Sequence, residues 1–181
     1  NPGTLIDPSA PKSVIGPGTG LGECFLTPYG DGLYKVWPSE GGHCDFAPKS
    51  ELEWRYANYI MSLVEPEDSP YNSFKPLQHI TYELALGGIV LPNIYYFFRA
   101  EHPELIDPAF EAEYEAPGVN KSKLLMEKGL AGSDLLCKKS AELFLRFLGY
   151  ECGNMIAKTI CRGGLYILGG IVQKNAELIS T

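Results

Sequence analysis

The chain has 181 residues, and its 22 acidic and 15 basic side chains give a net charge of −7 at pH 7. This acidic balance argues against nucleic acid or an anionic membrane surface as a partner. The 45% hydrophobic and 20% charged content is ordinary for a globular domain, which excludes a disordered chain and a collagen-like repeat. No apolar run approaches the roughly 20 residues of a membrane helix, so we expect a single domain over 1–181 that does not enter a membrane.

The first part of the chain is predicted to be extended. Residues 1–11 carry three prolines and little periodicity, which is typical of a connecting arm on a surface. Three short strands are expected to follow, at 13–15, 23–27 and 34–37. The glycine-dense segment 16–22 joins the first two strands, and 38–43 forms a second loop because its paired glycines disfavour regular structure.

Two helices are predicted in the middle of the chain. The first begins at a capping box formed by Ser50 and Glu53 and ends before Pro66. The second, rich in aromatic residues, is expected over 92–101, because proline fits a first helical turn. The acidic stretch 101–115 is predicted to be a solvated face and loop.

A long helix is the clearest element of the second half. Ser133 or Asp134 can cap it, and apolar residues at helical spacing continue to Ile156. Gly149 and Gly153 lie inside this pattern, and since each costs about 1 kcal/mol relative to alanine in a helix, they predict close packing against another backbone.

The chain after this helix is predicted to form a buried strand over 165–168, a tight turn at Gly169 and Gly170, and a new helix over 171–179. Strands mixed with helices of this length place the fold in the α/β class.

The five cysteines are odd in number and form no CxxC pair, which argues against a disulfide framework and against a zinc cluster. Cys137, Cys152 and Cys161 lie in or beside an apolar helical pattern and are predicted to be small buried side chains. We therefore expect reduced thiols and a cytoplasmic protein.

The segment 16–22 has glycine at every second position, with Thr19 in the middle. Glycines allow successive backbone N–H groups to converge on an anion, and the Thr19 hydroxyl adds a donor for a phosphate oxygen. The spacing matches neither a Walker A loop nor a dinucleotide fingerprint. A phosphate-binding loop and a simple hairpin turn both remain open.

A carboxylate and an imidazole, Glu40 and His43, flank the two glycines of the second loop. The carboxylate can accept hydrogen bonds from vicinal hydroxyls, the imidazole can donate or accept one, and the glycines let a ligand approach closely. This pattern favours a sugar. The alternative is a plain turn in which Asp45 caps nearby backbone and His43 is a satisfied polar residue.

Two further features carry weaker indications. The segment 163–172 is a buried strand that turns through Gly169 and Gly170 into a helix, which can place a planar base against backbone but is also an ordinary way to pack a strand on a helix. Glu83 is a lone acid in an apolar segment, and by itself it is predicted to be a surface carboxylate.

Taken together and in this order, the three segments resemble the bacterial-type glucokinases of the actin-like sugar kinase superfamily. Residues 16–22 resemble the second phosphate motif of that family, 40–48 its glucose-binding loop and 163–172 its adenosine motif. The resemblance covers nearly the whole chain, with weak matches at 65–78 and around Glu111. It implies a ribonuclease H-like α/β domain, in which helices flank a mixed sheet.

The resemblance also implies roles for individual residues. Glu40, His43 and Glu83 would bind sugar hydroxyls. The ATP contacts would come from five residues: Gly18, Thr19, Gly20, Gly169 and Gly170. The sequence departs from the family at 87–90, where Gly-Gly-Ile-Val replaces a Ser-Gly-Pro-Gly run, and this departure affects Glu83.

Family members begin with an Asp-x-Gly phosphate loop and later supply an Asn-Asp pair, whose aspartate is the base for the sugar 6-hydroxyl. Neither is in this sequence. The resemblance therefore implies that the base lies upstream of residue 1. The chain would be most of the large C-terminal lobe, without the small lobe and the C-terminal end, and inactive by itself.

The reaction implied by the resemblance is transfer of the γ-phosphoryl group of ATP to the 6-hydroxyl of glucose, the first step of glycolysis. Mg²⁺ would be held mainly by phosphates and by the other lobe, no structural zinc is expected, and a homodimer is compatible with the resemblance. Two alternatives remain open: a non-catalytic sugar sensor with the same fold, and a protein-interaction domain whose glycine segments are only turns.

Overall fold

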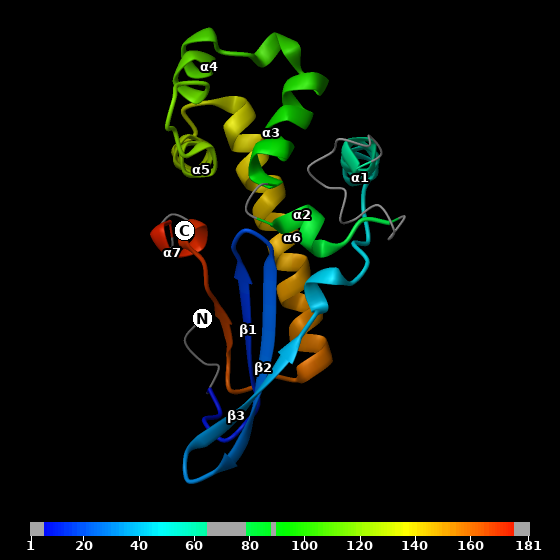
Figure 1. The fold of residues 1–181 in the computed structure, drawn as a ribbon, viewed down its shortest axis with the longest axis vertical. Helices are drawn as coiled ribbons and strands as arrows, with labels where there is room; N and C mark the ends of the chain where they lie inside the picture. The colour runs from blue at the N-terminus through cyan, green and yellow to red at the C-terminus, as the bar shows by residue number, and fades with distance from the viewer. Residues whose placement is uncertain (1–5, 65–78, 88–89, 176–181) are drawn as a thin grey trace.

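The computed structural model describes residues 6–64, 79–87 and 90–175. Its centre is a four-stranded mixed sheet in the order β3-β2-β1-β4 (Figure 1). The strands are β1 (Lys12–Pro17), β2 (Leu21–Gly30), β3 (Leu33–Ser39) and β4 (Leu165–Ile167). β1 pairs with β2 antiparallel and with β4 parallel. Helices and a mixed sheet confirm the predicted α/β class.

The first two strands form a hairpin whose turn is the glycine-dense segment. Gly16 pairs with Gly22 and Pro17 with Leu21, and the N–H of Gly18 donates to the carbonyl of Gly20 at 2.8 Å. The hairpin reading of this segment is thus confirmed, and the strands extend further than 13–15 and 23–27. β3 also runs on through Pro38. Proline has no N–H to donate, and an edge strand tolerates it because the outer side of the strand has no neighbouring strand to pair with.

The long helix α6 (Leu135–Thr159) organises the molecule. Asp134 caps it by accepting a hydrogen bond from the N–H of Cys137 at 2.7 Å, as predicted. In Figure 1, α6 runs from the helical end of the molecule down to the sheet. Near its C-terminal end, Thr159 hydrogen-bonds Ser13 of β1 at 2.8 Å. The two glycines of α6 contradict their prediction, because a Cβ at Gly149 or Gly153 would meet only open space.

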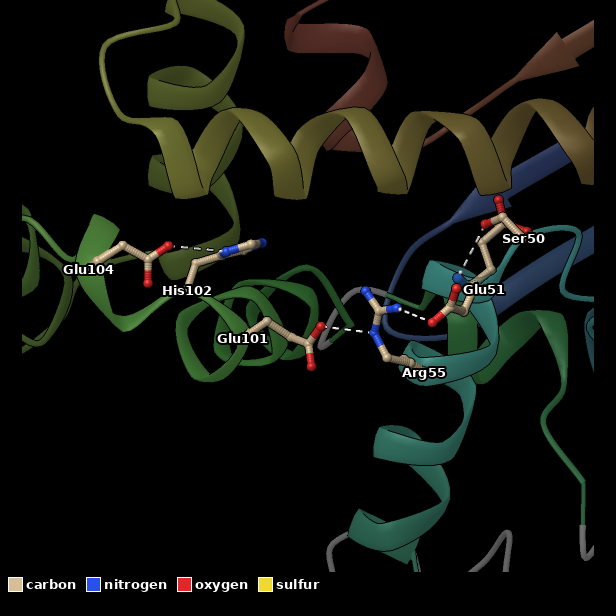
Figure 2. Close-up of polar contacts among 7 residues, drawn as sticks. Ser50, Glu51, Arg55, Glu101, His102 and Glu104 are labelled. Atoms are coloured by element: carbon tan, nitrogen blue, oxygen red, sulfur yellow. Dashed lines mark hydrogen bonds and ion pairs between the residues drawn. The ribbon is translucent and has the colours of Figure 1, made fainter.

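The helix α1 (Glu51–Val64) begins close to the predicted residue. The Ser50 hydroxyl accepts from the N–H of Glu53, while the Glu53 carboxylate accepts from the N–H of Lys49 rather than from that of Ser50. Figure 2 shows Arg55 joining two helices, since it contacts Glu51 of α1 at 3.1 Å and Glu101 of α3 (Val90–Glu101) at 2.9 Å. α3 ends as predicted and starts two residues earlier.

Several short helices were not predicted: η1 (Gly41–His43), α2 (Tyr82–Leu86), η3 (Pro103–Leu105), α4 (Pro108–Tyr114) and α5 (Lys121–Ala131). The acidic stretch 101–115 is therefore not only a solvated loop. Phe110 and Tyr114 of α4 are buried against Tyr95 of α3, with ring centroids 5.6 and 4.9 Å away. The high acidic content of this stretch led to the prediction of a solvated loop, although two of its aromatic side chains are buried.

The chain continues from β4 through Gly169 into α7 (Gly170–Lys174). Gly169 has φ +108°, which favours glycine, so the predicted turn is confirmed. α7 ends at Lys174, earlier than predicted, and residues 176–179 of the predicted helix lie outside the described residues. All five cysteines are free; Cys137 and Cys161 are buried and Cys152 is half-buried. No helix of the described ranges is long and apolar enough to span a membrane.

Candidate functional site

Residues 40–48, called the sugar loop from here on because of the resemblance described above, are held beside α2 by backbone pairing. The N–H of Phe46 donates to the carbonyl of Ile80 at 2.8 Å, and the N–H of Tyr82 donates to the carbonyl of Cys44 at 3.0 Å. Thr81 then starts α2, because its hydroxyl accepts from the N–H of Leu84. These contacts bring the loop at 40–43 next to the first turn of α2.

The three residues expected to bind sugar hydroxyls meet at this point. Nδ1 of His43 lies 3.2 Å from Oε2 of Glu40, and Nε2 of His43 lies 3.5 Å from Oε1 of Glu83. The exposed fraction of the side chain is 90% for Glu40, 47% for His43 and 23% for Glu83. The two carboxylates and the imidazole therefore form one group, in which exposure to solvent decreases from Glu40 through His43 to Glu83.

Glu83 is not the surface carboxylate that its sequence context predicts. Its Oε2 accepts a hydrogen bond from the N–H of Leu21 at 2.9 Å. It also packs on Gly20, where an added Cβ would overlap Oε2 and come within 2.9 Å of Cδ. The glycine-dense turn thus fixes the position of the Glu83 carboxylate.

The two glycines between Glu40 and His43 make room for the protein itself rather than for a ligand. A Cβ at Gly42 would overlap the backbone carbonyl oxygen of Leu21, and a Cβ at Gly41 would overlap the carboxylate of Glu23. The sequence-based explanation, in which glycine gives a ligand access, is replaced by close approach of the loop to β2.

Replacing Gly42 by alanine is expected to lower the free energy of unfolding by about 1–3 kcal/mol, because the clash is with backbone that cannot move aside. The melting temperature should fall by about 2–4 °C per kcal/mol. Thermal unfolding of Gly42→Ala beside Gly149→Ala checks this. The second variant meets open space inside α6 and should be neutral or stabilising, and equal melting temperatures for both would contradict the packing described here.

A second feature is a cavity of about 320 Å³ between the hairpin turn, α5 and α7. Gly18 and Thr19 line it from the turn, and Gly170 lines it from the start of α7. Gly20 and Gly169 do not line it, since Gly20 packs against Glu83 and Gly169 against the carbonyl of Pro17. Three of the five residues expected to contact ATP therefore share one cavity.

This cavity contains residues that sequence reasoning missed. From α5 come Asn120, Ser122, Lys123 and Glu127, and from the end of α7 come Lys174 and Asn175. Nζ of Lys123 lies 3.6 Å from Oε1 of Glu127, which makes an ion pair at the cavity wall. Lys174 adds a second ammonium group to the lining. Asn120 caps α5 by accepting a hydrogen bond from the N–H of Lys123. A capping residue at this position is the sequence signal that could have predicted the start of this helix.

The hairpin turn connects the two features. Its Gly18 and Thr19 face the cavity, while Gly20 and Leu21 hold Glu83. The C-terminal end of α2 approaches the same turn, since a Cβ at Gly87 would lie 3.2 Å from the carbonyl oxygen of Thr19. One short turn thus borders both the group of Glu40, His43 and Glu83 and a cavity that Lys123 and Lys174 line.

In the described ranges, no group of three or more His, Cys, Asp or Glu side chains could hold a metal ion. His79 and Asp45 form a separate ion pair at 3.0 Å beside the bridge between Asp45 and Thr81. That pair joins the loop to the segment that precedes α2.

The chain is similar in sequence to known proteins. The family model described as glucokinase matches residues 3–181. A glucokinase from Synechocystis is 36% identical over 183 residues, covering 96% of this chain and 48% of its own length. A glucokinase from Campylobacter jejuni is 30% identical, covering 99% of this chain and 47% of its own. The chain spans about half the length of the curated relatives it matches.

Solved structures show the same fold. A glucokinase from an Antarctic psychrotroph matches with a TM-score of 0.67 and 22% identity, over 97% of this chain and 47% of its own. A glucokinase from Balamuthia mandrillaris, in complex with glucose, matches with a TM-score of 0.67 and 19% identity, over 97% of this chain and 46% of its own. The family match over nearly every residue shows that this chain belongs to the glucokinase family.

Proposed function

We propose that this chain is the sugar- and nucleotide-binding part of a glucokinase, which transfers the γ-phosphoryl group of ATP to the 6-hydroxyl of glucose. The observation that carries the proposal is the meeting of Glu40, His43 and Glu83 beside the turn that carries Gly18 and Thr19. The neighbour solved in complex with glucose has the same fold and supports this assignment.

The chemistry of the two subsites suits the two substrates. Carboxylates at Glu40 and Glu83 accept hydrogen bonds from sugar hydroxyls, and the His43 imidazole donates or accepts one. On the other side of the turn, the Thr19 hydroxyl and the ammonium groups of Lys123 and Lys174 suit phosphate oxygens. The volume of about 320 Å³ lies within the usual range for small-ligand sites.

The role of this chain is positioning. Phosphoryl transfer depends on alignment and on neutralising charge at the phosphates. Mg²⁺ would be held mainly by the nucleotide phosphates and by residues of the other lobe, where it would neutralise phosphate charge. We further propose that 1–181 forms most of the larger lobe of a two-lobed kinase and that the general base comes from the other lobe. Assembly as a homodimer stays part of this proposal.

The proposal is tested by titrating the 181-residue chain with glucose in a calorimeter, beside a Glu83→Gln variant and a Glu142→Gln control. Glu142 is exposed on α6, away from the loop. Glucose should bind to the wild type and to the control, and more weakly to Glu83→Gln. Equal binding by all three proteins, or none by the wild type, would overturn the proposal.

Replacing Lys123 by alanine is expected to weaken ATP binding at least about tenfold, because hydrogen bonds to charged groups are worth about 1.5–3 kcal/mol. Glucose affinity should stay as it is, since Lys123 lines only the cavity on the far side of the turn. Fluorescent-nucleotide displacement measures the effect, with the exposed Lys138→Ala as control. Equal ATP affinity in both variants would place the nucleotide elsewhere.

A further inference from the structure

Asn175, which follows the last residue of α7, carries a buried amide that the function proposed above does not use. The residue is 8% exposed and lines the cavity between the hairpin turn, α5 and α7. Its Nδ2 donates a hydrogen bond to the carbonyl oxygen of Ile171 at 2.7 Å, and its backbone N–H donates to the carbonyl oxygen of Val172 at 3.2 Å. Both nitrogen atoms of Asn175 therefore bond to the backbone of α7.

The side-chain oxygen of Asn175 is left as an acceptor. A carbonyl oxygen only accepts hydrogen bonds, so the atom that contacts the Ile171 carbonyl has to be the amide nitrogen, and this contact fixes the orientation of the amide. Within 6–64, 79–87 and 90–175, no donor hydrogen-bonds Oδ1 of Asn175. The oxygen is also not fully enclosed by protein, so a ligand in the cavity can reach it. Because an acceptor in a buried position is unfavourable without a partner, a ligand that supplies a donor there gains affinity.

The phosphates of a nucleotide do not suit this oxygen. Ionised phosphate oxygens are acceptors, and an acceptor placed against the Asn175 carbonyl oxygen would be repelled. The donors that a nucleotide offers are the hydroxyls of the ribose and the exocyclic amino group of the base. The partner of Oδ1 is therefore one of these two groups.

The side chains around Asn175 favour the base. Met126 of α5 is 0% exposed, Ile171 of α7 is half-buried, and both line the cavity. The two helices contact each other, and Figure 1 shows α7 close to α5. A planar base buries its faces against apolar side chains and directs its polar edge at a few fixed groups, whereas ribose hydroxyls suit a more polar and hydrated setting. The cavity offers apolar side chains from both helices beside one acceptor oxygen.

The distance along α7 is compatible with this arrangement. Gly18 and Thr19 line the cavity at the hairpin turn, and Gly170 lines it at the start of α7. Asn175 follows Gly170 by five positions, which corresponds to about 7.5 Å along a helix axis. A nucleotide whose phosphates lie at the turn can thus reach Asn175 with its base.

We propose that Asn175 selects the nucleobase, because its Oδ1 accepts a hydrogen bond from the 6-amino group of adenine. This inference rests on the proposed function, since it names the base-selecting residue of the same nucleotide cavity. A 6-oxo purine presents an acceptor at this position, so that two oxygens would face each other with no proton between them. Such a base loses the hydrogen bond and leaves the Asn175 oxygen unpaired, and both effects lower its affinity.

The test compares the affinity of the 181-residue chain for ATP and for inosine triphosphate, which has an oxo group in place of the 6-amino group. Calorimetry measures both on the wild type, Asn175→Leu and Gln173→Leu. Leucine is close to asparagine in size but has no acceptor, and Gln173 is an exposed amide of α7 that does not line the cavity. Wild type and control should bind ATP about 10- to 100-fold more tightly than inosine triphosphate, and this ratio should fall below about threefold in Asn175→Leu.

Deoxynucleotides separate the base from the ribose. The loss of affinity from ATP to 2′-deoxy-ATP or to 3′-deoxy-ATP should be the same in the wild type and in Asn175→Leu. A loss that occurs only in the wild type would assign Oδ1 to a ribose hydroxyl and overturn the inference. Asn175→Ala is the second variant if Asn175→Leu fails to fold, because it also removes the acceptor and alanine is favourable in a helix.

The outcomes distinguish this inference from the proposed function. Equal affinity of the wild type for ATP and inosine triphosphate, or an unchanged preference in the Asn175 variants, overturns the role of Asn175 alone. No binding of either nucleotide by the wild type overturns the nucleotide part of the proposed function together with this inference. A preference for ATP that is present in wild type and Gln173→Leu and absent from the Asn175 variants supports the inference.

Discussion

The 181-residue chain, supplied with glucose, ATP and Mg²⁺, is expected to show no detectable formation of glucose 6-phosphate. A positioned general base contributes about 10²–10⁴ to the rate, and alignment of the two substrates contributes still more. We propose that the base belongs to the lobe outside these residues, since the chain spans about half the length of its relatives. A coupled assay of the purified chain measures the rate, with the Synechocystis glucokinase as the active reference.

Robust turnover by the isolated chain would contradict this expectation. It would mean that a residue within the chain takes the proton from the sugar hydroxyl. A chain that binds glucose but gives no turnover is also what the sensor alternative predicts, and sequence upstream of residue 1 separates the two. An Asn-Asp pair there favours the enzyme, and its absence favours the sensor.

Replacing Gly20 by alanine is expected to reduce glucose affinity about 10- to 100-fold with little loss of stability. The added Cβ would overlap the Glu83 carboxylate, which then turns away from the N–H of Leu21 and from His43. A hydrogen bond to a charged group is worth about 1.5–3 kcal/mol, which corresponds to this range of affinity. Calorimetry and thermal unfolding measure the two quantities separately.

Gly18→Ala is the matched control for this experiment. Gly18 occupies the same turn, but a Cβ there would meet only the Gly20 carbonyl oxygen at 4.0 Å. Its glucose affinity should equal that of the wild type. A loss of affinity in both variants would show that the turn as a whole, rather than Glu83, determines sugar binding.

The parts of the fold that sequence predicted are those with strong local signals. The helix α6 combines a capping residue, Asp134, with an apolar stripe over several turns, and both are properties of neighbouring residues. The strands around the hairpin are bounded by glycines and prolines that mark where regular structure stops. Such signals depend little on the rest of the molecule.

The elements that were missed have weaker local signals. α2 has five residues, too few for a helical period, and begins at Thr81 after a segment that pairs with the sugar loop. α5 is polar over much of its surface, so its apolar pattern is faint, although Asn120 and Gly132 mark both ends. The packing of α5 on α6 stabilises it, and that contact is not visible in a local pattern.

The residues of the candidate site likewise fall into those that the sequence predicted and those that it did not. Motif order identified Glu40, His43 and Glu83, and the structure places Glu40 at 3.2 Å and Glu83 at 3.5 Å from His43. Lys123 and Glu23 were missed because each reaches the site through contacts between segments far apart in the sequence. The function of the loop glycines was also misjudged, since the neighbours that exclude a Cβ belong to β2.

The most direct test of the account is amide chemical-shift mapping of the labelled chain with glucose and, separately, with a non-hydrolysable ATP analogue. We expect glucose to shift the amides of Leu21, Gly42 and His43, and the analogue to shift those of Gly18, Thr19 and Gly170, two groups that meet at the hairpin turn. Glucose shifts confined to the cavity of about 590 Å³ that Cys24, Phe25 and Lys158 line, or analogue shifts away from the turn, would contradict the claim that one glycine turn divides a sugar site from a phosphate site.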